Sequence, residues 1–250
     1  MRRHRLITEE EVDDFQSLYD RGCTMTRIAS ICDCDYSTVN RYLHRRGVAI
    51  RSFSEAVTLK FNPIYNEKLG YVLGVLFGDG SVSGSVAELC VKDYDFAEAF
   101  ANTISEVLNK RPVCKISKSK DGYYYVSVHR RKFAEWFKAL TYGSLEDILF
   151  GNKEMARGFL RGFFDSEGTY DGVQLKVDNK DPNLIILVVN LLDIYFGIEA
   201  SIHQYYTKSQ WNPKGYWVFR AYLPKRYHSL FLKEVGFSIK RKQLGGVCCA

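Results

Sequence analysis

One nine-residue pattern occurs twice in this chain of 250 residues, at 72–80 (VLGVLFGDG) and, 88 positions later, at 160–168 (LRGFFDSEG). Each copy is an apolar segment that ends in an acid followed by glycine. Small residues recur at every fourth position, and residues four apart share one face of a helix. The pattern therefore predicts two helices that pack closely through stripes of small residues, as such faces do in tight helix pairs. These residues are Gly70, Gly74 and Gly78 in the first copy and Gly158, Gly162 and Ser166 in the second.

Such a helix pair would place the two terminal acids, Asp79 and Glu167, side by side. Adjacent carboxylates do not ionise together readily without a counter-ion, and the negative end of a helix also favours a cation. Hard cations such as Mg²⁺ take carboxylate oxygens together with substrate phosphates, and phosphodiester cleavage uses such a metal to activate water. A single acid before glycine is commonly only a helix end. Two of them at an equal offset predict a metal site.

The repeat extends beyond the motif, because Lys92-Asp93 and Lys180-Asp181 keep the same offset. A fixed period indicates two copies of one unit. Each copy is predicted to contain a helix, strands, a helix capped by Asp93 or Asp181, further strands and a final helix. The strands are expected at 86–92, 123–129, 173–179 and 216–222, the final helices at 133–140 and 227–235, and a loop insertion near 209–215.

Both segments resemble the LAGLIDADG motif, and residues 64 to about 245 resemble a single-chain, two-repeat LAGLIDADG homing endonuclease. The first copy departs from the motif at Phe77, where many members carry an acid, whereas the second copy has Asp165 there. The resemblance implies an α+β fold of two pseudo-symmetric αββαββα repeats, whose antiparallel sheets form a saddle over DNA. A small all-α helix-turn-helix domain is expected before them. The expected boundaries are 1–51 for that domain, 52–63 for a linker, and 64–150 and 151–250 for the repeats.

The resemblance also implies an activity: a monomer that makes a double-strand break at a long, asymmetric DNA site, with Mg²⁺ as cofactor and Mn²⁺ or Ca²⁺ able to replace it. Asp79 and Glu167 would hold the cations with help from the carbonyls of Gly78 and Ser166, and water would be the nucleophile. A basic residue usually completes each half-site in the family. The candidates are Lys153, Lys240, Lys242, Lys92 and Lys180.

Basic residues are concentrated in the predicted strands and turns of both repeats, and the net charge of the chain is +6. Lys and Arg neutralise phosphates, and Gln and Tyr supply base-edge or sugar contacts, so double-stranded DNA is the expected partner. A solvated sheet face is the alternative for any one of them. The expected DNA-binding residues are Lys115, Lys118, Lys120, Arg130, His203, Gln204, Tyr205, Lys208, Gln210 and Arg220.

The first 60 residues carry a separate pattern. Thr8 opens a predicted helix with capping-box spacing, which Gly22 ends, and helices at 25–31 and 37–46 follow. The segment resembles a resolvase-like helix-turn-helix, whose third helix would enter the major groove; a three-helix module without a DNA role is the alternative. The residues offered to DNA are Tyr36, Ser37, Thr38, Asn40, Arg41 and Arg45, and then Arg51.

The seven cysteines are an odd number, which suits a reducing compartment, and without a signal peptide we expect an intracellular protein. No apolar run approaches the roughly 20 residues needed to cross a bilayer, so no membrane partner is expected. Cys23, Cys32, Cys34 and His44 could be zinc ligands, but their spacing fits no common zinc finger.

Two alternatives from other classes stay open. One known group combines a degenerate LAGLIDADG fold with a helix-turn-helix and regulates transcription without cutting, although the presence of both acids argues against it. Some LAGLIDADG proteins act as RNA maturases in intron splicing, and intron RNA would then be a partner. An intein is disfavoured because no splicing-domain sequence flanks the repeats.

Overall fold

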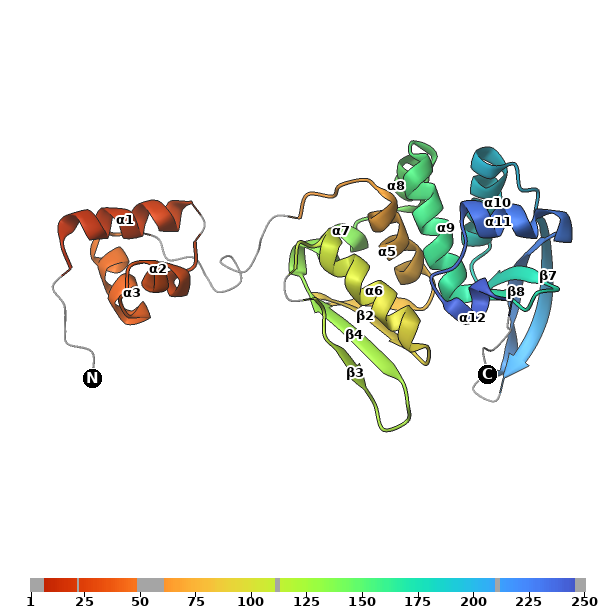
Figure 1. The fold of residues 1–250 in the computed structure, drawn as a ribbon, viewed down its shortest axis with the longest axis horizontal. Coiled ribbons are helices and arrows are strands. Elements are labelled where there is room, and N and C mark those ends of the chain that lie inside the picture. The colour runs from red at the N-terminus through yellow and green to blue at the C-terminus, as the bar shows by residue number, and fades with distance from the viewer. Residues whose placement is uncertain (1–6, 22, 49–60, 111–112, 210–211, 246–250) are drawn as a thin grey trace. The chain divides into compact units, whose positions relative to one another are not determined.

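The computed structural model describes residues 7–21, 23–48, 61–110, 113–209 and 212–245. The chain divides into two compact units, residues 1–60 and 61–250 (Figure 1). No helix within the described ranges has both the length and the apolar character needed to span a membrane.

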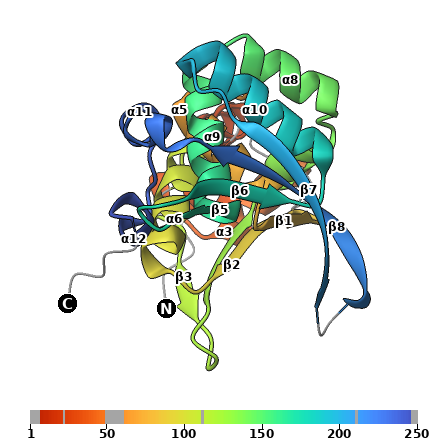
Figure 2. The same ribbon diagram turned by 90° about the vertical axis from the view of Figure 1, so that its right-hand side faces the viewer.

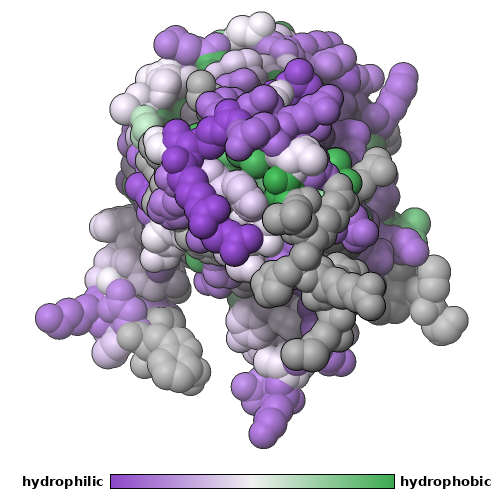
Figure 3. Space-filling model, turned by 90° about the vertical axis from the view of Figure 1, so that its left-hand side faces the viewer, coloured by the Kyte–Doolittle hydropathy of each residue, from purple (hydrophilic) through white to green (hydrophobic). Residues whose placement is uncertain are grey.

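The first unit contains the three predicted helices, α1 (Glu9–Asp20), α2 (Met25–Ile31) and α3 (Tyr36–Arg45). The α1 helix begins as expected, because Thr8 and Glu11 form a reciprocal capping box. Gly22, the expected end of α1, lies outside the described residues, and the helix ends at Asp20. Most of the residues visible in the space-filling view of Figure 3 are hydrophilic, and a small hydrophobic area lies among them. The core of the unit is formed by Phe15, Tyr19, Ile28, Ala29, Val39 and Leu43.

The second unit contains two copies of one αββαββα repeat, which confirms the predicted fold class. The first copy comprises α5 (Glu67–Phe77), β1 (Gly80–Ser83), β2 (Val86–Val91), α6 (Tyr94–Val107), β3 (Ile116–Lys118), β4 (Tyr124–His129) and α7 (Arg131–Lys138). The second comprises α9 (Lys153–Glu167), β5 (Gly168–Tyr170), β6 (Leu175–Asn179), α10 (Pro182–Phe196), β7 (Ser201–Ser209), β8 (Asn212–Leu223) and α11 (His228–Glu234). The remaining elements are α8 (Tyr142–Phe150), η1 (Lys225–Tyr227) and α12 (Lys240–Gln243).

Each repeat forms a four-stranded antiparallel sheet with the same strand order, β1-β2-β4-β3 in the first and β5-β6-β8-β7 in the second. The registers also correspond, since Gly80 pairs with Leu89 and, 88 residues later, Gly168 pairs with Val177. The helices cover one side of the sheets, and the hairpins β3–β4 and β7–β8 project on the other side (Figures 1 and 2). The sheets thus leave an open face opposite the helices.

The expected loop insertion at 209–215 has a different form in the structure. The β7 strand continues to Ser209 and β8 already begins at Asn212, with a register shift between Thr207 and Ser209. The rings of Tyr206 and Trp217, which are paired across the hairpin, lie 5.4 Å apart edge to face, an arrangement that stabilises paired strands. The extra residues therefore lengthen the hairpin.

The two repeats meet at α5 and α9, whose backbones approach closely along the predicted stripes of small residues. A Cβ at Gly74 would overlap the carbonyl oxygen of Phe159, and a Cβ at Gly162 would overlap that of Tyr71. Glycine is required here because any side chain would separate the two helices. This close approach places the ends of α5 and α9 next to one another, at the boundary between the two sheets.

Candidate active site and nucleic-acid interface

Asp79 and Glu167 lie together where α5 and α9 end. Asp79 follows Gly78, the C-cap of α5, and Glu167 is the last residue of α9. Gly78 packs on Ser166, and a Cβ at Gly78 would lie 3.3 Å from the Cγ of Glu167. The two carboxylates interact electrostatically, because the charge of Asp79 raises the pKa of Glu167.

The environment of the pair opposes ionisation of both acids. Burial raises the pKa of Asp79, although part of its side chain is exposed, and Lys242 opposes this shift. Burial, and then the charge of Asp79, raises the pKa of Glu167 to about 7. Two partly desolvated carboxylates with too little positive charge fit a hard divalent cation, which supplies the missing charge and accepts oxygen ligands. The donor set thus suits Mg²⁺ or Mn²⁺.

Asn179 is a member of the site that the sequence did not indicate. Its Nδ2 donates a hydrogen bond to Oε1 of Glu167 at 2.8 Å, and its Oδ1 accepts one from the backbone N–H of Asp181 at 2.9 Å. The equivalent position in the first repeat is Val91, which is buried and apolar. In the sequence, the one indication of a role for Asn179 is its position directly before the repeated pair Lys180-Asp181.

Lys242 is the one proposed basic residue of the C-terminal segment that the structure buries beside the acids. Its Nζ donates to the carbonyl oxygens of Phe164 at 3.2 Å and of Asp165 at 2.5 Å, at the end of α9. Burial lowers the pKa of Lys242 to about 8, and its charge acts on both Asp79 and Glu167. Its ammonium thus caps the helix that carries Glu167.

The other basic candidates have different positions. Lys153 begins α9, so it is separated from Glu167 by the length of the helix, about 21 Å at 1.5 Å per residue, and its Nζ lies over the ring of Phe196. The structure therefore does not bring Lys153 to the acids. Lys240 is exposed on α12, and its backbone N–H donates to Asp95.

Lys92 and Lys180 occupy equivalent positions at the ends of β2 and β6. The Nζ of Lys92 lies 5.2 Å from the ring centre of Tyr123, and that of Lys180 lies 4.3 Å from the ring centre of Tyr216. Lys180 and Glu167 also line one hollow of the second repeat. Both repeats thus hold a lysine against a tyrosine of the long hairpin, Tyr123 in the β3–β4 turn and Tyr216 in β8.

Asp165, the acid that replaces Phe77 of the first repeat, is buried and joins three segments. It accepts hydrogen bonds from the hydroxyl of Tyr71 on α5 at 3.0 Å and from the backbone N–H of Ser238 at 3.0 Å. Burial raises the pKa of Asp165 to about 6, and these hydrogen bonds oppose the shift. Asp165 therefore holds the helix pair together, and the sequence gave no sign of these partners.

A hollow of about 480 Å³ opens beside Glu167 on the open face of the second sheet. Next to it, the guanidinium of Arg220 binds Asp178 through two hydrogen bonds of 2.6 and 2.8 Å, and it lies 4.8 Å from the ring centre of Tyr205. The hollow offers charged and aromatic groups to a ligand that also reaches the acid. It is lined by Glu167, Asp178, Asn179, Lys180, Tyr205, Thr207, Tyr216 and Val218.

Strand alternation decides which predicted DNA-binding residues share this open face. In the second repeat, Ala221 is buried on the helix side, so its register partner Ile202 and the next alternate residue, Gln204, also lie on that side. In the first repeat, Lys118 pairs with Tyr124 on the side of the buried Val126. The structure therefore does not place Gln204 or Lys118 on the open face. It does place His203, Tyr205 and Arg220 there.

The remaining predicted contacts lie in several places. Lys115 is exposed just before β3, Lys120 lies in the β3–β4 turn, Arg130 caps α7, and Lys208 is exposed near the end of β7. Gln210 and Arg51 lie outside the described residues. The residues of α3 that were expected to reach DNA are exposed or half-buried: Tyr36, Ser37, Thr38, Asn40, Arg41 and Arg45.

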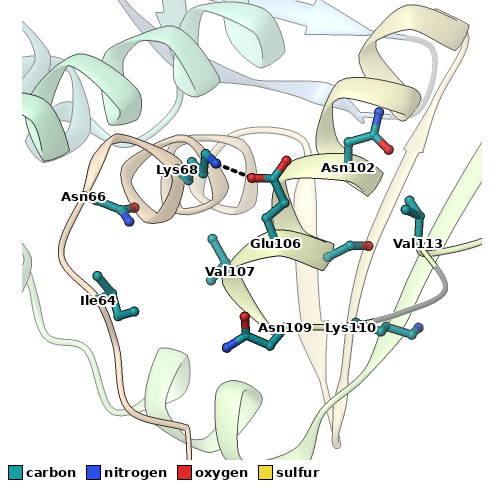
Figure 4. A pocket seen from close by; sticks show the side chains of 10 residues that line it. Ile64, Asn66, Lys68, Asn102, Glu106, Val107, Asn109, Lys110 and Val113 are labelled. Atoms are coloured by element: carbon teal, nitrogen blue, oxygen red, sulfur yellow. Dashed lines mark hydrogen bonds and ion pairs between the residues drawn. The ribbon is translucent and has the colours of Figure 1, made fainter.

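A second hollow, of about 1070 Å³, lies at the start of α5 and the end of α6 (Figure 4). Lys68 and Glu106, two of the residues that line it, form an ion pair, and it contains none of the predicted site residues. In the described part of the chain, no three His, Cys, Asp or Glu side chains cluster in a way that could hold a metal, and this includes the cysteines of the first unit.

Comparison with known proteins identifies the family of the chain. A family model described as "LAGLIDADG-like domain" matches residues 154–236. The uncharacterized protein MJ0314 of Methanocaldococcus jannaschii is 34% identical over 184 residues, which are 66% of this chain and 69% of that protein. The chain belongs to the same family as MJ0314 and carries a LAGLIDADG-like domain.

Solved structures show where this fold occurs. The crystal structure of the homing endonuclease I-DmoI in complex with DNA and Mn matches with a TM-score of 0.53 at 19% identity, over 69% of this chain and 98% of that one. The N-terminal LAGLIDADG domain of DUF199/WhiA matches with a TM-score of 0.51 at 20% identity, over 75% and 92% of the two chains. The second unit therefore has the LAGLIDADG fold.

Proposed function

We propose that this protein is a metal-dependent DNA endonuclease that makes a site-specific double-strand break. The observation that carries the proposal is the pairing of Asp79 with Glu167 at the meeting point of two equivalent repeats, one acid from each. Two acids related by pseudo-symmetry match the two strands of a duplex, each of which needs one phosphodiester bond broken.

The two acids would hold divalent cations, with the main-chain carbonyls of Gly78 and Ser166 as further oxygen donors. A bound cation lowers the pKa of water and stabilises the charge on the phosphate and on the leaving oxygen. Asn179 orients the carboxylate of Glu167, and the ammonium of Lys242 supports the end of the helix behind it. I-DmoI, which has the same fold, was crystallised with DNA together with Mn or Ca, and this supports our choice of cations.

Substrate binding in this proposal uses the open faces of both sheets and the three-helix unit. His203, Tyr205 and Arg220 would contact DNA on the second sheet, and α3 would read base edges as the recognition helix of a helix-turn-helix. Because the two sheets differ at nearly every exposed position, we propose a monomer on a long, non-palindromic site. A palindrome would instead call for two identical half-sites.

The test begins with selection of a binding site from a random double-stranded DNA library, followed by cleavage of the selected DNA in Mg²⁺. We expect the wild type to give linear product from a plasmid that carries the site. Asp79→Asn and Glu167→Gln should bind this DNA with near wild-type affinity without cutting it, because affinity arises from many distributed contacts. Binding without cleavage by the wild type would instead identify a non-cleaving regulator, and selective binding of intron RNA would identify a maturase.

A further inference from the structure

A chain of three hydrogen bonds connects a helix at the end of the first repeat with the acid of the second. The hydroxyl of Tyr142, in the first turn of α8, donates to Oδ2 of Asp181. The backbone N–H of Asp181 donates to Oδ1 of Asn179 at 2.9 Å, and Nδ2 of Asn179 donates to Oε1 of Glu167 at 2.8 Å. Every donor in this chain has its acceptor, so the contacts form one continuous path.

We infer that Tyr142 is a positioning residue for Glu167. It acts through Asp181 and Asn179 and touches neither DNA nor metal. The inference rests on the proposed function, since Glu167 is treated as the metal-binding acid of the second repeat. It adds a residue of α8, which lies between the two repeats in the sequence, to the groups that orient this acid.

The amide of Asn179 explains how the path transmits orientation. An amide has an accepting oxygen end and a donating nitrogen end, so a hydrogen bond to its oxygen fixes the direction in which its nitrogen end points toward Glu167. The N–H of Asp181 holds that end. Asp181 is itself fixed twice, because its Oδ1 caps α10 by accepting from the N–H of Asn183 at 2.9 Å while its Oδ2 accepts from Tyr142.

The side chain of Tyr142 is 40% exposed, and its hydroxyl contacts Asp181. Burial, followed by the contact with Asp181, raises the pKa of the Tyr142 hydroxyl. Loss of the hydroxyl would leave Oδ2 of Asp181 without this donor.

The first repeat has a corresponding contact but lacks the link to its acid. Asp93 is equivalent to Asp181, and Arg241 of α12 binds it through hydrogen bonds of 3.0 and 2.8 Å. In each repeat, the aspartate at the N-cap position of the second helix is thus contacted by a helix from outside that repeat, α8 for Asp181 and α12 for Asp93. However, Val91 stands where the second repeat has Asn179, so no amide connects Asp93 with Asp79. Among the described residues, the two half-sites are therefore supported unequally: a hydrogen-bonded path from Tyr142 of α8 reaches Glu167, and none of this kind reaches Asp79.

The same interface supplies a matched control. The hydroxyl of Tyr195 on α10 donates to the carbonyl oxygen of Phe150 on α8 at 2.5 Å. It joins the same two helices as the contact between Tyr142 and Asp181, but it does not lead to Glu167. Tyr142→Phe and Tyr195→Phe each remove one hydroxyl from this interface, so a difference between the two variants reports on the path and not on packing.

The experiment measures binding of Mn²⁺ alone to the full-length protein by calorimetry. Tyr142→Phe should weaken Mn²⁺ binding about threefold, because the lost hydrogen bond acts on Glu167 only through Asp181 and Asn179 and transmits part of its free energy, and Tyr195→Phe should leave it unchanged. Asn179→Ala should weaken it about tenfold or more, as outer-shell changes do. In the double variant, Tyr142→Phe should add nothing to Asn179→Ala, because the path is already broken. Equal Mn²⁺ affinities in the two tyrosine variants, or additive effects in the double variant, would overturn the inference.

Plasmid cleavage separates this inference from the proposed function. If the wild type cuts its selected site, Tyr142→Phe should raise the ratio of nicked to linear DNA, because one half-site is misplaced, and Tyr195→Phe should not. A merely structural role would lower the folded fraction and slow both cuts together without changing this ratio, which would count against Tyr142. If the wild type binds Mn²⁺ but cuts no selected DNA, the proposed function fails and the order of Mn²⁺ affinities still decides the role of Tyr142. A wild type that binds no Mn²⁺ at millimolar concentration overturns both.

Discussion

Gly158 on α9 lies against the main-chain carbonyl of Glu67 on α5, so closely that a Cβ at Gly158 would overlap the oxygen. The same contact recurs with the helices exchanged, since Gly70 lies against the carbonyl of Met155. Both members of the second contact are 88 residues from their counterparts in the first. The pseudo-twofold axis therefore passes between the two helices, and the distance between their backbones sets the separation of the two acids.

The first prediction concerns this close approach. Gly158→Ala should destabilise the protein by about 1–3 kcal/mol, the usual cost of forcing extra atoms into a packed interface, and lower the melting temperature by several degrees. Gly143→Ala is the control, because Gly143 also lies in a helix but has only the Thr141 hydroxyl near the added Cβ, at 4.0 Å. Replacing that glycine should have no such cost, since alanine favours helices. Equal melting temperatures in the two variants would contradict the helix-pair geometry.

The second prediction concerns the pH dependence of stability without metal. The pKa of Glu167 is about 7 in the folded protein and 4.5 ordinarily, so between these values only the folded state holds the proton. Stability should therefore fall as pH rises through this window. Glu167→Gln removes this effect, and the melting temperature of the variant relative to wild type should increase from pH 5 to pH 8.

The control for this titration is Glu146→Gln, which changes an exposed glutamate on α8. Its melting temperature should follow the wild-type pH profile in parallel. Addition of Mn²⁺ at pH 8 should reverse the order of wild type and Glu167→Gln, since a ligand stabilises the state that binds it. If Glu167→Gln gave a profile parallel to wild type, the raised pKa of this acid would be disproved.

The third prediction concerns the buried lysine. Lys242→Met should destabilise the protein by about 2–3 kcal/mol, because two carbonyl oxygens at the end of α9 would lose a charged donor. Lys240→Met is the matched control, since the side chain of Lys240 is exposed and its bonded backbone N–H is retained in the variant. Thermal unfolding of both variants decides the matter. A Lys242→Met protein as stable as Lys240→Met would show that the cap contributes nothing.

The helix pair and its two acids could be predicted from the sequence because they depend on local periodicity, which survives in a single chain. Asn179 and Tyr142 could not, since their importance arises only when a strand end, a helix cap and a helix from outside the repeat meet. The first repeat has Val91 at the position equivalent to Asn179. A comparison of the two repeats identifies residues that both of them contain, so it does not identify Asn179.

The sequence also did not show which face of the sheet each strand residue occupies. In β7, Tyr205 and Tyr206 are adjacent aromatic residues, so the pattern does not show which of them faces the helices. The register decides, because Tyr206 pairs with Trp217, which lies on the same face of β8 as the buried Ala221, on the helix side. Tyr205 pairs with Val218, which lies on the same face of β8 as Arg220. The same ambiguity explains why Gln204 was grouped with His203 in the sequence, although neighbouring residues of a strand point to opposite faces.

The fourth prediction concerns α3 of the first unit, whose exposed face is proposed to read DNA. Each good base contact is worth about 1–3 kcal/mol of discrimination, so Arg41→Ala should lower affinity for the selected site without changing thermal stability. Arg46→Ala should act in the opposite way. The guanidinium of Arg46 binds Glu9 and Asp13 at 2.6 Å each, and its loss should lower the melting temperature of the unit while DNA affinity per folded molecule stays near wild type.

Deletion of residues 1–51 extends the same prediction to the footprint. The protein has one such unit and two repeats, so the protected DNA should become shorter on one side only. Cleavage at saturating protein should persist, because Asp79 and Glu167 are retained and the second unit has its own core. Footprinting and plasmid cleavage measure the two effects separately. A truncated protein with the full footprint and full affinity but a lower melting temperature would show that the three helices stabilise the second unit and do not read DNA.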